Sequence, residues 1–209
     1  MDEAPTLAQR ARAEAYARGP GWRYDPAYRR IAGALALTEG ALLDIGCGPG
    51  LVCVHAAAGH PELDCVGIDT NPAMIRLARR SAGRRLNCTF RVMDGAAIRY
   101  PAATFHRVVA VQTMHHWTDP DAVLAEIHRV LRPGGIAMLH DADPSAEIDP
   151  AFVRRRGRWP PDLWLRQMWR RDSLGDAGFE DMLERTRRLA WADVGVDTLG
   201  FYRRIVARR

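Results

Sequence analysis

The chain has 209 residues, of which 47% are hydrophobic, and its 30 basic residues outnumber its 25 acidic ones to give a formal net charge of +5. This length suits a single α/β domain with a well-buried core. No segment approaches the roughly eighteen continuous apolar residues of a membrane span, and residues 1–5 lack the basic and apolar regions of a signal peptide. These features exclude a membrane-spanning protein and lead us to expect a cytoplasmic enzyme with no membrane partner.

The first predicted elements are two helices. Residues 5–18 are rich in alanine and arginine in an amphipathic pattern, which a Gly-Pro-Gly sequence at residues 19–21 ends. A second helix is predicted over residues 26–37, and it leads directly into the first predicted strand. No internal repeat and no low-complexity linker divides the chain into two domains.

The glycine-rich stretch at residues 42–50 is the most informative part of the chain. A buried strand precedes its turn, and Leu51 opens an apolar helix after it. Gly46, Gly48 and Gly50 remove every Cβ from one side of the turn, so a ligand can lie against backbone groups. In dinucleotide-binding turns the third glycine comes one position later, and a P-loop is excluded because the chain contains no lysine. The turn is therefore predicted to hold a different cofactor.

The next two predicted strands each end in an acid. The strand at residues 63–68 ends in Asp69, 23 residues beyond Gly46, which is near the spacing at which an acid binds ribose hydroxyls. The strand at residues 89–93 ends in Asp94. A single aspartate at a strand end is often only a turn former or a helix cap, so the hypothesis depends on the ordered set. A strand, a helix ended by Pro133 and a further strand follow, at residues 105–111, 121–131 and 136–139.

Taken in this order, the motifs from Tyr24 to Asp143 resemble those of the class I S-adenosylmethionine-dependent methyltransferases, and among them the small stand-alone type 11 enzymes. The resemblance implies a doubly wound, Rossmann-like α/β fold. Such a fold has a seven-stranded, mostly parallel sheet with an antiparallel last strand and helices on both faces. It also implies S-adenosyl-L-methionine as the cofactor. The residues that would hold this cofactor are Asp44, Gly46, Cys47, Gly48, Gly50, Asp69, Thr70, Asp94, Gly95 and Gln112.

The resemblance also suggests how the chain is organised around the acceptor. In this family N-terminal segments close over the cofactor and the acceptor, so we expect residues 1–30 to form a helical lid segment. Residues 31–209 would form a single methyltransferase domain, in which residues 144–171 are an insertion on the substrate side. The last strand is predicted over residues 201–207.

Candidate catalytic groups lie where the fourth and fifth predicted strands end, because ligands of open parallel sheets bind there. His115 or His140 could deprotonate an acceptor, although such a histidine is often structural in the resembled enzymes. The candidates for substrate binding are Trp22, Tyr24, His115 and Trp159, and core packing would also account for the aromatic ones. No metal is predicted, because the fourth strand ends in Gln112 where metal-dependent relatives have a carboxylate.

Two smaller observations qualify the resemblance. His106 stands where the family usually has an aspartate, which weakens the subfamily assignment and leaves the cofactor assignment intact. The four cysteines show no metal-ligand spacing and are predicted to be small buried hydrophobes; they are Cys47, Cys53, Cys65 and Cys88.

The predicted acceptor is a small molecule with a hydroxyl, carboxyl or amine group. The residues after the fourth strand are not the Asn/Asp-Pro-Pro-aromatic tetrad of base-directed methyltransferases. Residues 151–209 hold 14 arginines and 8 acids interleaved with tryptophans, so an RNA methyltransferase that uses this region is one alternative. A solvated helical face explains the same arginines. A non-catalytic module that binds S-adenosylmethionine is a third hypothesis, and the oligomeric state is open.

Overall fold

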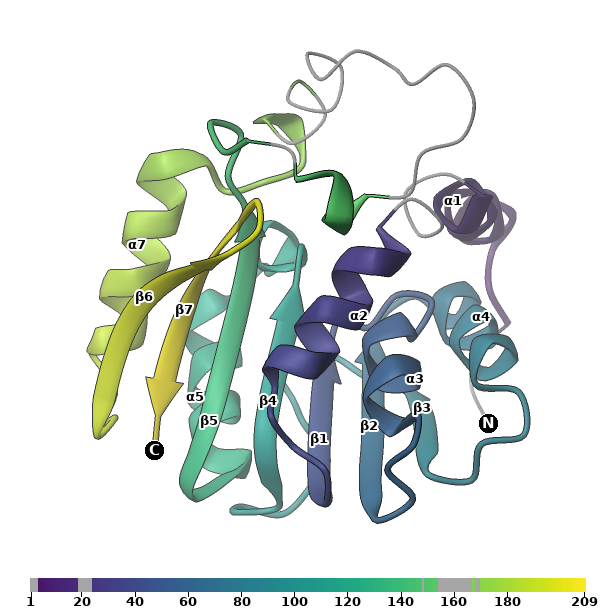
Figure 1. Cartoon of the computed structure of the whole chain (residues 1–209), viewed down its shortest axis with the longest axis horizontal. Helices are drawn as coiled ribbons and strands as arrows, with labels where there is room; N and C mark the ends of the chain where they lie inside the picture. Colours follow the sequence, from purple (N-terminus) through teal and green to yellow (C-terminus); the bar gives the residue numbers. More distant parts are fainter. Residues whose placement is uncertain (1–3, 19–23, 148, 154–166, 168–169) are drawn as a thin grey trace.

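The computed structural model describes residues 4–18, 24–147, 149–153, 167 and 170–209. Its centre is a seven-stranded sheet in the order β3-β2-β1-β4-β5-β7-β6 (Figure 1). β7 pairs antiparallel with both of its neighbours, and all the other neighbouring strands pair in parallel. The predicted fold class is confirmed. The strands are β1 (Gly40–Ile45), β2 (Leu63–Asp69), β3 (Cys88–Val92), β4 (Phe105–Val111), β5 (Leu131–Ala142), β6 (Asp193–Leu199) and β7 (Tyr202–Arg208).

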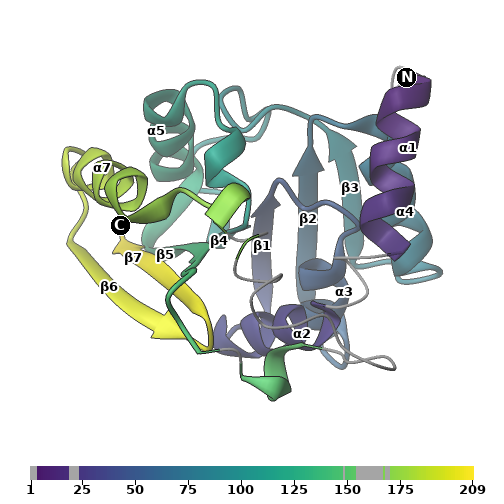
Figure 2. The same ribbon diagram turned by 90° about the horizontal axis from the view of Figure 1, so that it is seen from above.

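Helices cover both faces of the sheet, as Figure 2 shows from above. Three of them, α2, α3 and α4, lie on one face, and α5 and α7 lie on the other. α1 lies over α4 near the edge of the sheet that β3 forms. None of the described helices is long and apolar enough to cross a membrane. The helices are α1 (Leu7–Tyr16), α2 (Asp25–Ala34), α3 (Leu51–Ala57), α4 (Pro72–Ala82), α5 (Pro120–Val130) and α7 (Gly175–Arg187), with short 3-10 turns η2 (Met114–His116) and η3 (Pro150–Phe152).

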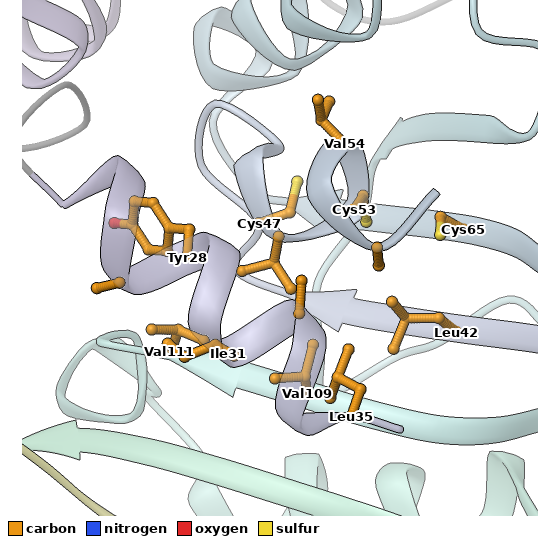
Figure 3. Packing of buried hydrophobic residues seen from close by; sticks show 14 of the residues in the cluster. Tyr28, Ile31, Leu35, Leu42, Cys47, Cys53, Val54, Cys65, Val109 and Val111 are labelled. Carbon is orange, nitrogen blue, oxygen red and sulfur yellow. The ribbon is translucent and has the colours of Figure 1, made fainter. Parts of the chain in front are cut away.

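The core has two halves because side chains of a strand alternate between its faces. In β1, Leu42 packs with the helices α2 and α3, whereas Leu43 and Ile45 pack on the side of α5 and α7. Figure 3 shows the first half, in which Cys53 of α3 and Cys65 of β2 lie among aliphatic side chains. All four cysteines are free, and three of them are buried. The prediction that they act as small core residues is confirmed for those three.

The helices that follow strands start at defined points near the same end of the sheet. Asn71 accepts a hydrogen bond from the backbone N–H of Ala73, and Asp119 accepts one from Ala122. A proline follows each of these capping residues, where its fixed φ suits the first helical position. The two caps fix the residues at which α4 and α5 begin, after the strands β2 and β4.

β5 is longer than predicted, and its final residues tie the last third of the chain to the sheet. Asp141 is fully buried, and its Oδ2 accepts a hydrogen bond of 3.0 Å from the backbone N–H of Leu174, just before α7. Burial raises the pKa of Asp141 to about 6, although the Leu174 N–H and the Arg203 guanidinium oppose the shift. Compared with the unfolded chain, the folded protein therefore favours the protonated form of the Asp141 carboxyl.

We expect ionisation of Asp141 to destabilise the fold. A carboxyl whose folded pKa lies above its unfolded value of 3.8 contributes stability at low pH and loses it as the pH rises through about 6. The free energy of unfolding should fall by up to about 3 kcal/mol over this range, at about 1.4 kcal/mol for each pKa unit. Asp141→Asn keeps an acceptor for Leu174 without the charge, so urea unfolding at several pH values should show a flatter profile. Parallel profiles for the two proteins would contradict this expectation.

Candidate active site

A cavity of about 530 Å³ opens at the carboxyl ends of the parallel strands. Its floor comes from the ends of the four strands β1, β2, β3 and β4 and the loops that follow them. Its other side comes from α1 and α2, which contribute Arg12, Tyr16 and Tyr28. Open parallel sheets bind ligands at this edge, so the cavity is the candidate active site.

The three glycines of the turn after β1 have different neighbours. A Cβ on Gly46 would lie 2.1 Å from the Thr113 hydroxyl oxygen, and one on Gly50 would lie 2.6 Å from the Phe90 ring. Both positions must therefore lack a side chain for the turn to pack. A Cβ on Gly48 would meet nothing within 4 Å, and its φ of +50° is one that few other residues adopt. Gly48 alone of the three leaves open space beside a cavity wall.

Asp44 is a carboxylate in a site that suits a cation. It is 2% exposed, yet it lines the cavity, and the Cys53 thiol donates to its Oδ2 over 3.9 Å. Burial raises the pKa of Asp44 well above its usual value, and the nearby Asp69 raises it further. No described basic side chain pairs with this carboxylate. A bound cation would stabilise the charged form of Asp44 and so oppose both the burial and the repulsion from Asp69.

Asp69, at the end of β2, holds the glycine turn. Its Oδ2 accepts a hydrogen bond from the backbone N–H of Gly48 at 3.0 Å, and its Oδ1 accepts one from Asn71 at 2.8 Å. Burial raises the pKa of Asp69, and the two backbone donors oppose the shift. Each carboxylate oxygen can accept a second hydrogen bond, so Asp69 can bind a ligand hydroxyl while it keeps the turn in place.

Two helices that precede the sheet place a pair of phenols over this end of the cavity. The hydroxyl groups of Tyr16 in α1 and Tyr28 in α2 are hydrogen-bonded to each other. Burial raises the pKa of both, and Asp69 and Asp44 lie close enough to Tyr16 to raise its pKa further. Arg12 lies one helical turn before Tyr16 and also lines the cavity. No pattern in the sequence pointed to Arg12 or Tyr16, because the position of α1 over the sheet could not be predicted.

Nine of the ten residues predicted to bind the cofactor line this one cavity. Gly50 is the exception, since it packs against Phe90 behind the turn. Gln112 has a φ of +52°, and its side-chain oxygen accepts a hydrogen bond of 2.7 Å from the Ala142 N–H, which joins the ends of β4 and β5. The nine are Asp44, Gly46, Cys47, Gly48, Asp69, Thr70, Asp94, Gly95 and Gln112.

The two histidines predicted to be catalytic do not line the cavity. His140 lies inside β5 with 0% exposure, its ring against Tyr202, and burial lowers its pKa to about 3. This placement contradicts the prediction of a base that meets the acceptor. Burial and the adjacent His116 lower the pKa of His115 to about 4, and its Nδ1 is buried without a hydrogen-bond partner. The geometry therefore does not favour His115 as a base or as a substrate-binding residue.

The other substrate-binding candidates are also outside the cavity wall. Tyr24 is buried in the core, with its ring 5.9 Å from that of Phe201, so the prediction that it contacts substrate is not supported. Trp22 and Trp159 lie outside the described residues. His116 and Trp117, which were not among the candidates, line the cavity. Among the described residues, no three His, Cys, Asp or Glu side chains are grouped so as to hold a metal ion.

Comparisons with known proteins agree with this geometry. Residues 42–135 match the family model described as a methyltransferase domain. Over this stretch the chain is similar to class I methyltransferases. The chain is 34% identical over 125 residues to a demethylmenaquinone methyltransferase of Deinococcus radiodurans. This alignment covers 58% of the chain and 52% of that protein. The chain is also 33% identical over 138 residues to the 27-O-demethylrifamycin SV methyltransferase of Amycolatopsis mediterranei. This alignment covers 62% of the chain and 50% of that protein.

A solved structure extends the comparison to the whole fold. A structure titled as a putative S-adenosyl-L-methionine-dependent methyltransferase from Methanococcus maripaludis superposes with a TM-score of 0.77 and 17% identity, and the match covers 99% of this chain and 96% of that one. At this identity the likeness shows the fold alone. The chain spans about half the length of the two curated relatives.

The open space beside Gly48 generates a test of the cofactor site. Gly48→Val would place a branched side chain in the cavity, so we expect it to abolish binding of S-adenosylmethionine in calorimetry. Gly59→Val is the matched control, because Gly59 also has a positive φ of +83° and open space around it, but it does not line the cavity. Both variants should lose similar stability from backbone strain. Unchanged affinity in Gly48→Val, or equal loss in both, would refute the cradle assignment.

Proposed function

We propose that this methyltransferase transfers the methyl group of S-adenosyl-L-methionine to a small-molecule acceptor held in the cavity. The observation that carries the proposal is the combination of open backbone space at Gly48 with the two carboxylates Asp44 and Asp69 in one cavity wall. A dinucleotide cofactor brings phosphates, which two carboxylates would repel. A ligand with an ammonium group, a sulfonium and ribose hydroxyls suits the same wall.

Each part of the cofactor has a matching group in the cavity. Its ammonium would bind Asp44, which is buried and has no described cationic partner. Its ribose hydroxyls would donate to the free acceptor positions of Asp69. Its adenine would lie toward the end of β3, where Met93, Asp94 and Gly95 form the wall. These assignments use no phosphate-binding group.

The chain contributes mainly by holding the reactants in line. S-adenosylmethionine supplies a methyl group on a sulfonium that is already a good leaving group, so the transfer itself needs no acid or base. The cavity walls fix the direction of approach, and such alignment accounts for a large share of rate enhancement in reactions of this type. The Tyr16–Tyr28 pair and α1 cover the cavity from the side opposite the strands and reduce its contact with water.

His116 is the group we assign to proton removal, where the acceptor is a hydroxyl or an amine. It lines the cavity, it is exposed, and it lies close enough to Asp69 to lower that carboxyl's pKa. The ring of His115 packs against it with centroids 4.0 Å apart. An imidazole nitrogen in the cavity wall can accept a proton from an acceptor bound beside it, which fits this role.

A small acceptor is favoured over RNA by the site and by the relatives. A cavity of this size is in the range of small-molecule sites, roughly 300 to 1,000 Å³. The two relatives named above act, by their names, on demethylmenaquinone and on a rifamycin derivative. The tryptophans of the C-terminal Arg/Trp-rich region (Trp159, Trp164 and Trp169) lie outside the described residues. The assay described next distinguishes the small-molecule proposal from the RNA alternative and from the non-catalytic module.

Transfer of labelled methyl tests the proposed function. The protein is incubated with methyl-labelled S-adenosylmethionine and a metabolite extract that has been separated into small-molecule, RNA and protein fractions. We expect label in the small-molecule fraction, and Gly48→Val should remove it. Nuclease-sensitive label in RNA would replace the proposal by the RNA alternative. Tight cofactor binding with no label in any fraction, across extracts from several sources, would favour the non-catalytic module.

The role of His116 is tested with its neighbour as the control. With an acceptor identified by that assay, His116→Gln should lower kcat by at least about tenfold near neutral pH, since general bases typically contribute a hundredfold or more. Its affinity for S-adenosylmethionine should change by less than about twofold. His115→Gln should keep kcat within about threefold of wild type. Loss of activity in the His115 variant alone would show that the wrong histidine was assigned.

A further inference from the structure

One short segment in the middle of the chain carries a strong positive charge. Residues 76–99 contain seven arginines and a single acid, Asp94, which belongs to the cavity wall. Ten of the eleven acids between residues 51 and 150 lie outside this segment. Residues 51–150 are therefore nearly balanced in total charge, but their positive and negative residues lie in different parts of the sequence.

The structure brings this segment to one edge of the molecule. It comprises most of α4, the turn at residues 83–87, the edge strand β3 and the start of the loop that follows (Figure 2). All seven of its arginines are exposed. Six of them form no ion pair with a described carboxylate. We call this surface the basic edge, and these six arginines are Arg76, Arg80, Arg84, Arg85, Arg91 and Arg99.

The basic edge is not built to accept another β-strand. The guanidinium of Arg79 donates to the carbonyl of Phe90 at 2.8 Å, and that of Arg99 donates to the carbonyl of Val92 at 3.3 Å. An incoming strand would need such carbonyls as acceptors, and charged side chains on an edge strand discourage strand addition. The groove of about 700 Å³ along β3 is lined by Arg79, Arg91 and Arg99. Its charge suits an anionic partner.

A leucine projects from the middle of this charge. Leu86 is 99% exposed at the turn between α4 and β3, directly after Arg84 and Arg85. The turn is ordered, because the side chain of Asn87 donates to the carbonyls of His60 and Leu63 at 3.0 Å each. Nucleic-acid backbones offer nothing for an exposed leucine to contact. A lipid surface takes both features, the arginines on its phosphates and the leucine in its apolar boundary.

We propose that the basic edge is a docking surface for an anionic phospholipid bilayer. This is peripheral attachment, which the sequence-based expectation of no membrane partner did not consider, since it rested on the absence of a spanning segment. Two acids, Glu62 and Asp64, lie in the segment to which Asn87 is bonded, and they reduce the six positive charges without balancing them. Each arginine near an anionic surface adds to the attraction, and salt weakens it.

Vesicle flotation with the whole chain tests the proposal. The protein is mixed with vesicles of phosphatidylcholine alone or of phosphatidylcholine with phosphatidylglycerol, at low and at high salt. We expect binding to the anionic vesicles only, reversed by salt. The double variant Arg84→Gln, Arg85→Gln should bind at least about tenfold more weakly, and Leu86→Ser several-fold more weakly.

Matched controls distinguish binding by the basic edge from nonspecific electrostatic or hydrophobic binding by other surfaces. Arg187→Gln with Arg188→Gln removes two consecutive exposed arginines at the end of α7, and Val196→Ser removes an exposed apolar side chain on the opposite edge strand β6. Both controls should float like wild type. No binding to anionic vesicles, or equal losses in the controls, would overturn the proposal. Binding of single-stranded RNA that needs Arg84 and Arg85 but not Leu86, without vesicle binding, would reassign the surface to nucleic acid.

Discussion

Two carboxylates, Asp44 and Asp69, face the same cavity, and Asp69 raises the free energy of the charged form of Asp44. Asp44 is fully buried, and both burial and Asp69 raise its pKa. Asp69 is held in place by the backbone N–H groups of Gly48 and Asn71. Such a pair is costly unless a cationic or hydroxyl-rich ligand binds between its members. The choice of cofactor follows from this electrostatic constraint more directly than from the glycine motif alone.

The glycine turn connects this constraint to the fold. Gly46 and Gly50 are packing positions, where the turn passes the Thr113 and Phe90 side chains, and Gly48 faces the ligand space. A motif with three glycines therefore contains two different requirements. The whole molecule shows a similar separation. The ends of strands β1 to β4 form the site, and the basic edge at β3 carries positive charge outside that site. A basic composition by itself would not have distinguished these surfaces.

The sequence was sufficient for the sheet and for nine of the residues that line the cavity, because both depend on local patterns. Strand ends such as Asp69 and Asp94 follow from short apolar runs and their spacing. The sequence was insufficient where an error of a few residues in the predicted end of an element changes what a side chain contacts. The fifth strand was predicted to end at Leu139 but continues to Ala142, which places His140 inside the sheet. His115 and His116 share one 3-10 turn, yet only His116 lines the cavity. Tyr16 reaches the cavity only through the tertiary position of α1.

A crystal structure of the protein with S-adenosylhomocysteine tests the central claim most directly, since this product keeps the amino acid, ribose and adenine of the cofactor. The account predicts that its amino group lies within hydrogen-bond distance of Asp44 and that its ribose hydroxyls lie within the same distance of Asp69. Its backbone contacts should include Gly48. A ligand bound elsewhere, or one whose amino group and ribose avoid both carboxylates, would contradict the account.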